Sequence, residues 1–282
     1  MVVHLADESC LTKEYLDTKI DWIPSMRNLR QKDIPAVIHT TNPDDINFML
    51  HETDRAKRAY AIILNTFDDH ENDRGDSVFG LAHYQISGQC SLCQLWEHNC
   101  DERGTACGVR LGFGGNGERF FWVIRPDLVA GDVAMVPPEF LAKTADRRML
   151  VSWCPQEKFM SHPAIGGFLT HCGWNLILES ICAGVHMACW PFFTEHQLNC
   201  KFYCDEWEIG IEISADVKRK EVQAVIRELM DGEKGKKMKS KVKEWQHLAK
   251  EAMEDKHGSS KLNFELVVNK LLVREEEIML GK

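Results

Sequence analysis

Short apolar segments alternate with helical segments between residues 119 and 213, and this alternation constrains the fold more than any other feature. An alternation of this kind predicts a parallel sheet with helices on both faces, and therefore an α/β fold. Right-handed crossovers would bring the carboxyl ends of the strands, at Trp153, His171 and Trp190, to one side. The predicted strands are 120–124, 148–151, 166–171, 186–190 and 210–213, and the predicted helices are 174–183 and 195–207.

The turn at 171–175 follows one predicted strand and opens a predicted helix. Open α/β sheets bind ligands at such positions. The free backbone N–H groups and the positive dipole end of the helix together favour an anion, without any metal. The sequence therefore predicts a phosphate site at this turn.

Composition excludes several classes of protein. The chain has 282 residues, 44% of them hydrophobic and 27% charged, and a net charge of −9, which argues against a surface that tracks nucleic-acid phosphates. No apolar run is long enough for a membrane helix, and we expect no membrane partner. The eleven cysteines lie scattered, and the opening MVVHLADESCLTKEY has no signal-peptide core. Reduced thiols and a cytoplasmic location are therefore expected.

The segment 153–196 resembles the signature of plant secondary-product (family 1) UDP-glycosyltransferases. It follows W-x-P-Q…H-P-x-x-G-G-F-x-T-H-x-G-W-N-S-x-x-E…W-P-x-x-x-[ED]-Q at nearly every position. The sequence after 203 is most similar to the subgroup of cyanohydrin and terpenoid glucosyltransferases. The resemblance implies a GT-B type fold, with a Rossmann-like C-terminal donor domain and a partial N-terminal domain.

The resemblance also divides the chain. It implies that 1–80 is a remnant of the N-terminal acceptor-binding domain, 81–118 an atypical linker, 119–258 the UDP-sugar donor-binding domain, and 259–282 a C-terminal helix and tail. The family's strand V-V-Y-V-x-F-G-S, which starts the donor domain, has no match in this sequence.

Eleven residues match the donor-binding positions of the family. Trp153 would stack on uracil, Gln156 would bond the uridine and Glu179 the ribose; a core position closing the sheet is the alternative for Trp153. The full set of eleven matching residues is Trp153, Cys154, Gln156, His171, Gly173, Trp174, Asn175, Leu176, Glu179, Glu195 and His196.

The remaining roles concern the diphosphate and the sugar. His171 and Asn175 would contact the diphosphate, although a hydrogen-bonded core position is the alternative for His171. Glu195 and His196 would hold the sugar hydroxyls. His196 stands where glucose-using members have Gln and some galactose-using members have His, so the donor is UDP-glucose or UDP-galactose.

Two further residues depart from the family pattern. Leu176 replaces the usual Ser and removes a phosphate-binding hydroxyl, a loss of about 1 kcal/mol. His186 replaces Pro and relaxes a constrained turn. We expect both changes to weaken donor binding.

Three other features have ordinary explanations beside functional ones. Cys90-x-x-Cys93, with His98, Cys100 and Cys107, can supply zinc ligands, but free thiols in a loop fit the absence of a second CxxC better. The G-x-G-x-x-G match at 112–117 precedes a strand instead of following one, which indicates a flexible turn. The Lys-rich 234–245 is interpreted as the solvated face of a helix.

Two apolar faces and a loop complete the expected structure. Helical faces are expected at 222–230 and 238–252, with Gly258 stopping the second helix and Ser259 or Ser260 capping the last one. A loop is expected at PPEF, 137–140.

The reaction implied by the resemblance is transfer of a hexose from a UDP-sugar to a hydroxyl of a small apolar secondary metabolite, with inversion and without metal or other cofactor. The family's general base, a His held by an Asp, has no matching position, so no catalytic residue is assigned; His4 is expected to be an ordinary surface histidine. The alternatives are a catalytically inactive, truncated form that binds UDP or UDP-sugar or partners full-length relatives, and a faulty gene model for 1–118.

Overall fold

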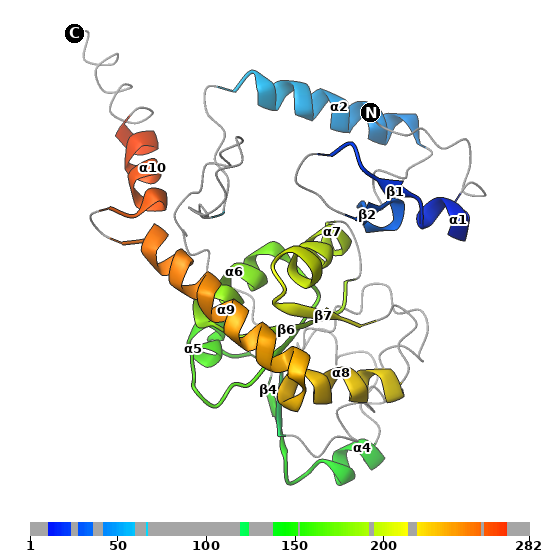
Figure 1. Cartoon of the computed structure of the whole chain (residues 1–282), viewed down its shortest axis with the longest axis vertical. Coiled ribbons are helices and arrows are strands. Elements are labelled where there is room, and N and C mark those ends of the chain that lie inside the picture. The colour runs from blue at the N-terminus through cyan, green and yellow to red at the C-terminus, as the bar shows by residue number, and fades with distance from the viewer. Residues whose placement is uncertain are drawn as a thin grey trace. The chain divides into compact units, whose positions relative to one another are not determined.

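The computed structural model describes residues 11–23, 28–35, 42–59, 66, 119–123, 138–151, 153–191, 195–213, 219–254 and 257–269. The chain divides into two compact units. Figure 1 labels helices and strands of both. The first unit comprises Met1–Thr41 and Gly88–Lys243, and the second comprises Asn42–Ser87 and Glu244–Lys282. Each unit is described separately.

The first unit contains two parallel sheets. Strand β3 (Phe120–Val123) pairs with β4 (Arg148–Val151), and β6 (Met187–Cys189) lies between β5 (Phe168–Thr170) and β7 (Gly210–Glu212). Outside the N-terminal segment, the three strand pairings in the described residues are parallel, which confirms the strand positions and the α/β fold expected from the sequence.

Helices in this unit follow the strands as predicted. Helix α5 (Gln156–Met160) follows β4, and α6 (Trp174–Ala183) has the expected bounds. Helix α7 (His196–Lys201) continues into a π-helical turn, η7 (Phe202–Glu206), in place of a uniform α-helix.

One local prediction is wrong. Residues expected to form a loop at PPEF belong in part to helix α4 (Pro138–Lys143). Pro138 suits the first turn of a helix, because that position needs no backbone N–H donor. Phe140 is buried and packs edge-on to Trp122, with ring centroids 6.1 Å apart, so burial of this side chain stabilises the helix.

The apolar core of the first unit joins both sheets to α8 (Arg219–Asp231) and α9 (Glu233–Ala252). Trp122 from β3 and Ala188 from β6 are buried in the same cluster as Ile226 and Met238. Shared burial of this kind holds the strand ends in place, because interior side chains pack at the density of organic crystals.

The helical face predicted at 222–230 is confirmed with one exception. Val222, Ile226 and Leu229 are buried, whereas Met230 is exposed. A β-carbon added to Gly166 would lie 2.6 Å from the terminal methyl of Met230, so Met230 lies across this glycine instead of entering the core.

His186 makes a contact that the sequence does not predict. Its Nε2 donates to the Leu229 backbone oxygen at a distance of 2.8 Å, and its side chain is buried. In place of a relaxed turn, the imidazole therefore joins the start of β6 to α8.

An N-terminal segment also belongs to the first unit. It contains α1 (Lys13–Leu16), the antiparallel pair β1 (Lys19–Ile20) and β2 (Leu29–Arg30), and the short 3-10 helix η2 (Gln31–Asp33). Asp33 accepts from the Arg30 backbone N–H at 2.9 Å and from its guanidinium, which closes this turn, and η2 contacts α7.

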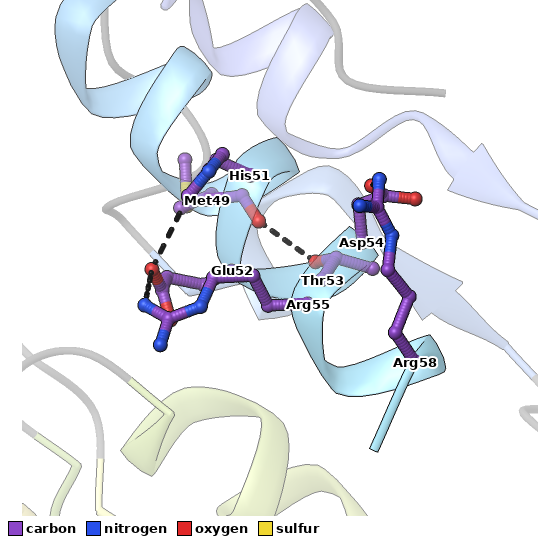
Figure 2. A network of polar contacts seen from close by, with 7 residues as sticks. All are labelled: Met49, His51, Glu52, Thr53, Asp54, Arg55 and Arg58. Atoms are coloured by element: carbon purple, nitrogen blue, oxygen red, sulfur yellow. Dashed lines mark hydrogen bonds and ion pairs between the residues drawn. The ribbon is translucent and has the colours of Figure 1, made fainter.

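In the second unit, α2 (Pro43–Lys57) is a surface helix. Asn42 caps its start through a bond from the Asp44 backbone N–H (3.1 Å), and Pro43 occupies the first turn. Ion pairs between Glu52 and Arg55 and between Asp54 and Arg58 follow its exposed side, as do the contacts of Met49 with Thr53 (Figure 2). Exposed pairs of this type each contribute about 0.5 kcal/mol or less.

Near the end of the chain, the predicted helix end at Gly258 and the predicted cap of the last helix are wrong. Helix α9 ends at Ala252, six residues before Gly258, and Gly258 is the N-cap of α10 (Ser259–Val268). Neither Ser259 nor Ser260 caps this helix. A β-carbon at Gly258 would lie 2.6 Å from the Glu254 backbone nitrogen, so the tight turn before α10 requires glycine.

Several predictions lie outside the described residues. These are His4, the possible zinc ligands Cys90, Cys93, His98, Cys100 and Cys107, and the glycine-rich 112–117. The division into domains at 80 and 118 also falls there and stays a prediction. Among the helices in the described ranges, none is both long and apolar enough to cross a membrane.

Candidate functional site

The site is built around the turn between β5 and α6. Thr170 ends the strand, and its Oγ1 accepts from the Cys172 backbone N–H at 3.1 Å. Asn199 from α7 donates its side-chain N–H to the Cys172 carbonyl at 3.0 Å. These two bonds hold Cys172 in the left-handed conformation, φ 71°, which few non-glycine residues adopt.

Gly173 is the N-cap of α6 and provides no side chain to cap it. The first turn of the helix also has no acidic residue. A β-carbon at Gly173 would lie 2.7 Å from His171 Nε2, so the absence of a side chain admits the His171 ring to the helix start. The positive end of the α6 dipole therefore lies beside an imidazole, and no carboxylate of the helix's own first turn neutralises it.

His171 is partly buried and its Nδ1 has no hydrogen-bond partner among the described residues. Burial lowers the pKa of His171 to about 4; His196 also lowers it and Glu195 opposes the shift. The ring is therefore neutral at pH 7. A buried polar nitrogen without a partner does not fit a fully hydrogen-bonded core histidine and is typical of a position that receives a ligand.

His196 and Glu195 lie next to His171. The ring centroids of the two histidines are 4.7 Å apart, and Glu195 Oε1 is 4.0 Å from His196 Nε2. His196 is buried, which lowers the pKa of its ring against the opposing effect of Glu195. Glu195 is exposed at the start of α7, so its carboxylate faces solvent beside the two imidazoles.

Gln156 and Glu179 are brought together from different elements. Gln156 begins α5, Glu179 lies in the middle of α6, and Gln156 Nε2 donates to Glu179 Oε2 at 2.6 Å. Asn175 is exposed one turn before Glu179 on the same face of α6. Asn175 and Glu179 are separated by about 6 Å along the axis of α6. The N-terminal turn of the helix therefore lies close to the Gln156–Glu179 pair.

Trp153 follows β4 and has 64% of its surface exposed. An exposed indole of this size does not close the sheet, which removes the alternative of a core aromatic. Its flat face remains available for stacking, three residues before Gln156.

Two of the expected site residues point into the interior. Cys154 is buried with Val123, and Leu176 is buried in the first turn of α6. The Leu176 side chain is therefore placed for packing, whereas Cys154 is disulfide-bonded, in contrast to the reduced thiols expected from the sequence. Trp174 is half-buried and packs near Tyr203 and Trp207, with centroids 6.4 and 6.1 Å apart.

The sequence reasoning missed two features. Asn199 supports the turn, and four of the cysteines described as scattered gather in space: Cys172, Cys189, Cys200 and Cys204. The i, i+4 spacing of Cys200 and Cys204 on a predicted helix was the available signal, because such residues share a face.

Comparison with known proteins identifies the family. The model of the family "UDP-glucoronosyl and UDP-glucosyl transferase" matches residues 100–247, more than half of the chain. The chain is 58% identical over 314 residues to UDP-glycosyltransferase 85A2 of Arabidopsis thaliana, covering 96% of this chain. It is 46% identical to 7-deoxyloganetin glucosyltransferase of Gardenia jasminoides and 44% identical to (R)-mandelonitrile beta-glucosyltransferase of Prunus dulcis, covering 95% and 92% of this chain.

The structure is also similar to solved members of the family. Phytolacca americana UGT2, in complex with UDP-2fluoro-glucose and pterostilbene, superposes with a TM-score of 0.76 at 28% identity, over 93% of this chain and 66% of that one. A UDP-glucosyltransferase from Polygonum tinctorium gives a TM-score of 0.75 at 26% identity, over 93% and 65%.

These findings confirm the GT-B type α/β fold and the subgroup expected from the sequence. The chain belongs to the UDP-glycosyltransferase family, among plant enzymes that include cyanohydrin and terpenoid glucosyltransferases. It spans 65% of the length of UDP-glycosyltransferase 85A2, and 65%, 64% and 63% of the length of UDP-glycosyltransferases 85A1, 85A3 and 85A5 of the same plant. Because the 314 aligned positions exceed the 282 residues of the chain, part of the relative has no counterpart here.

Proposed function

We propose that this chain binds a UDP-sugar at the β5–α6 turn and transfers the hexose, with inversion, to a hydroxyl of a small apolar secondary metabolite. The observation that carries the proposal is the start of α6, which no side chain caps, beside the Nδ1 of His171, which has no hydrogen-bond partner in the part of the chain that the structure describes. Membership of the family supports the proposal, as does the match to UDP-glycosyltransferase 85A2, 65% of whose length is covered.

The proposed donor site divides the ligand into three parts. The helix start, His171 and Asn175 meet the diphosphate; a helix terminus accepts this charge without a metal or other cofactor. Trp153 stacks on the base, while Gln156 and Glu179 bond the uridine and ribose. In the transfer step, the same helix terminus stabilises the charge that develops on the departing UDP.

We infer that Glu195 holds the sugar hydroxyls, because its carboxylate is exposed beside the histidine pair. His196 is buried against His171, so it acts on the sugar mainly by placing Glu195. UDP-glucose and UDP-galactose are both candidate donors. The relatives named for 7-deoxyloganetin and (R)-mandelonitrile support a small-molecule acceptor.

Calorimetry with UDP and a glycosylation assay test the proposal. The purified chain should bind UDP, and should glycosylate a flavonoid, terpenoid or cyanohydrin acceptor from UDP-glucose or UDP-galactose. Absence of UDP binding would contradict the donor site. Binding without turnover would contradict only the transferase activity and support a UDP-sugar-binding module.

The domain organisation and location belong to the same proposal. Residues 119–258 form the donor domain, flanked by the acceptor-domain remnant at 1–80, the linker at 81–118 and the tail at 259–282. A cytoplasmic location is also proposed: Cys172, Cys189, Cys200 and Cys204 are free thiols, as a reducing compartment favours, although Cys154 is disulfide-bonded. Imaging of a fluorescent fusion in plant cells tests the location.

A further inference from the structure

Four thiols gather at the carboxyl edge of the three-stranded sheet. The Sγ atoms of Cys172, Cys189 and Cys200 all lie within 4.8 Å of one another, and these side chains are buried. Cys204 Sγ is 3.9 Å from Cys200 Sγ, and Cys204 is partly exposed. These four residues are called the thiol cluster.

The backbone around the thiol cluster holds the sulfurs in place. Cys172 keeps its left-handed conformation through its bonds with Thr170 and Asn199. A non-glycine residue in this conformation is strained and persists only where its surroundings fix it. Cys189 ends β6, so its position is set by hydrogen bonds to both neighbouring strands.

Gly210, the first residue of β7, leaves room for the sulfurs. A β-carbon there would lie 2.9 Å from Cys189 Sγ and 3.2 Å from Cys204 Sγ. Cys200 and Cys204 lie four residues apart where α7 passes into the π-helical η7. Single π-helical turns within helices are frequent at functional sites.

Four sulfurs at these separations match the ligand set of a structural zinc site. Zn–S bonds of about 2.3 Å in a tetrahedron separate the sulfurs by about 3.8 Å, close to the 3.9 Å between Cys200 and Cys204. A buried cysteine alone behaves as a small apolar side chain. Apolar packing, however, does not require three sulfurs within 4.8 Å of one another and a fourth 3.9 Å from one of them.

We propose that the thiol cluster binds one Zn²⁺ ion, with Cys172, Cys189, Cys200 and Cys204 as ligands. Four Zn–S bonds replace four S–H bonds, and the protons pass to solvent. The ion enters from the side of Cys204, the partly exposed ligand. Because Cys172 lies between His171 and Gly173, the bound ion stabilises the β5–α6 turn through this buried ligand.

Cd²⁺ titration of the full chain, reduced with a phosphine and stripped with a chelator, tests this site. The ultraviolet cadmium–thiolate absorption should saturate at about one ion per chain, and Zn²⁺ should abolish it by competition. The Cys200→Ser/Cys204→Ser variant should lose the absorption. Saturation without thiolate absorption, or no binding, overturns the proposal.

Control variants separate this cluster from the other cysteines. Cys90→Ser/Cys93→Ser and Cys182→Ser, which change cysteines outside the cluster, should keep the full absorption. Loss of the absorption in Cys90→Ser/Cys93→Ser overturns the proposal, since the ion would then be bound there. If the double cluster variant fails to fold by circular dichroism, the single Cys204→Ala change decides: Cd²⁺ affinity should fall at least tenfold, and an unchanged affinity overturns the proposal.

Discussion

Gln156 donates a 2.6 Å hydrogen bond from Nε2 to Glu179 Oε2, which joins the start of α5 to the middle of α6. The two residues are 23 positions apart, and both were assigned to the nucleoside from the sequence resemblance. Their contact places the proposed uridine and ribose partners at one point.

Replacement of Glu179 by Ala should weaken UDP binding by about 1–3 kcal/mol, that is about 5- to 150-fold in Kd, because the ribose loses its acceptor and Gln156 loses its partner. Calorimetry of Glu179→Ala, Gln156→Ala and the double variant measures the coupling. The exposed neighbour Glu157→Gln is the control and should bind as the unchanged chain does. Strictly additive effects of the two alanine changes would argue against a shared role.

Trp153→Ala should weaken UDP binding by about 1–3 kcal/mol, the usual contribution of base stacking on an aromatic side chain. Its free energy of unfolding should change by less than about 0.5 kcal/mol, because the indole is mostly exposed. Trp22→Ala, which removes another indole with 56% exposure, is the matched control for both measurements. An equal loss of UDP affinity in the two variants would contradict the stacking role.

Gly173→Ala should disrupt the helix start, because the new methyl group would overlap the His171 ring. We expect at least a tenfold loss of UDP affinity and a lower Tm. In His171→Ala/Gly173→Ala the overlap is gone, so the Tm should recover while UDP binding stays weak. Gly166→Ala meets only the flexible end of Met230 and serves as the control. Recovery of UDP binding in the double variant would show that His171 has no role in it.

His186→Ala should lower the free energy of unfolding by about 1–3 kcal/mol, since the Leu229 carbonyl loses its buried donor. His257→Ala, at an exposed position, is the control. Denaturant unfolding followed by fluorescence measures both. If His186→Ala loses no more free energy of unfolding than the control, water donates to the Leu229 carbonyl in place of the imidazole.

The same residue predicts a pH dependence. Burial lowers the pKa of His186 below its ordinary value of 6.5, Lys239 acts in the same direction, and the bond to Leu229 opposes them. The unfolded chain therefore binds a proton first, so stability from the neutral ring is complete above pH 6.5 and is lost as the pH falls through the folded pKa. His186→Gln keeps a donor but does not titrate. The stability of the unchanged chain relative to this variant should fall below pH 6.5; a constant difference would contradict the shift.

His196→Gln should shift the donor preference towards UDP-glucose if His196 influences the sugar through Glu195. Turnover with UDP-glucose and UDP-galactose, measured as a ratio of kcat/KM, checks this. The ratio should change severalfold, whereas His162→Gln, a change at an exposed histidine, should leave it unchanged. A clear glucose preference of the unchanged chain would remove the galactose hypothesis.

Much of the fold follows from the sequence because it depends on local patterns. The apolar runs at β4 and β5 and the bounds of α6 agree with residue periodicity, since a buried strand or an apolar helix face is specified by neighbouring residues. The α4 segment and the turn at Gly258 were missed, because there a single buried ring and a close backbone approach outweigh local preference.

The sequence by itself determined the α/β alternation, the family and the position of the turn at His171 and Gly173. Only the tertiary structure decided which distant side chains meet: Gln156 with Glu179, His186 with Leu229 across 43 positions, and the four members of the thiol cluster. The physical reason is that local periodicity fixes which face of an element is buried, whereas packing of those faces fixes the partner of each buried polar or sulfur atom.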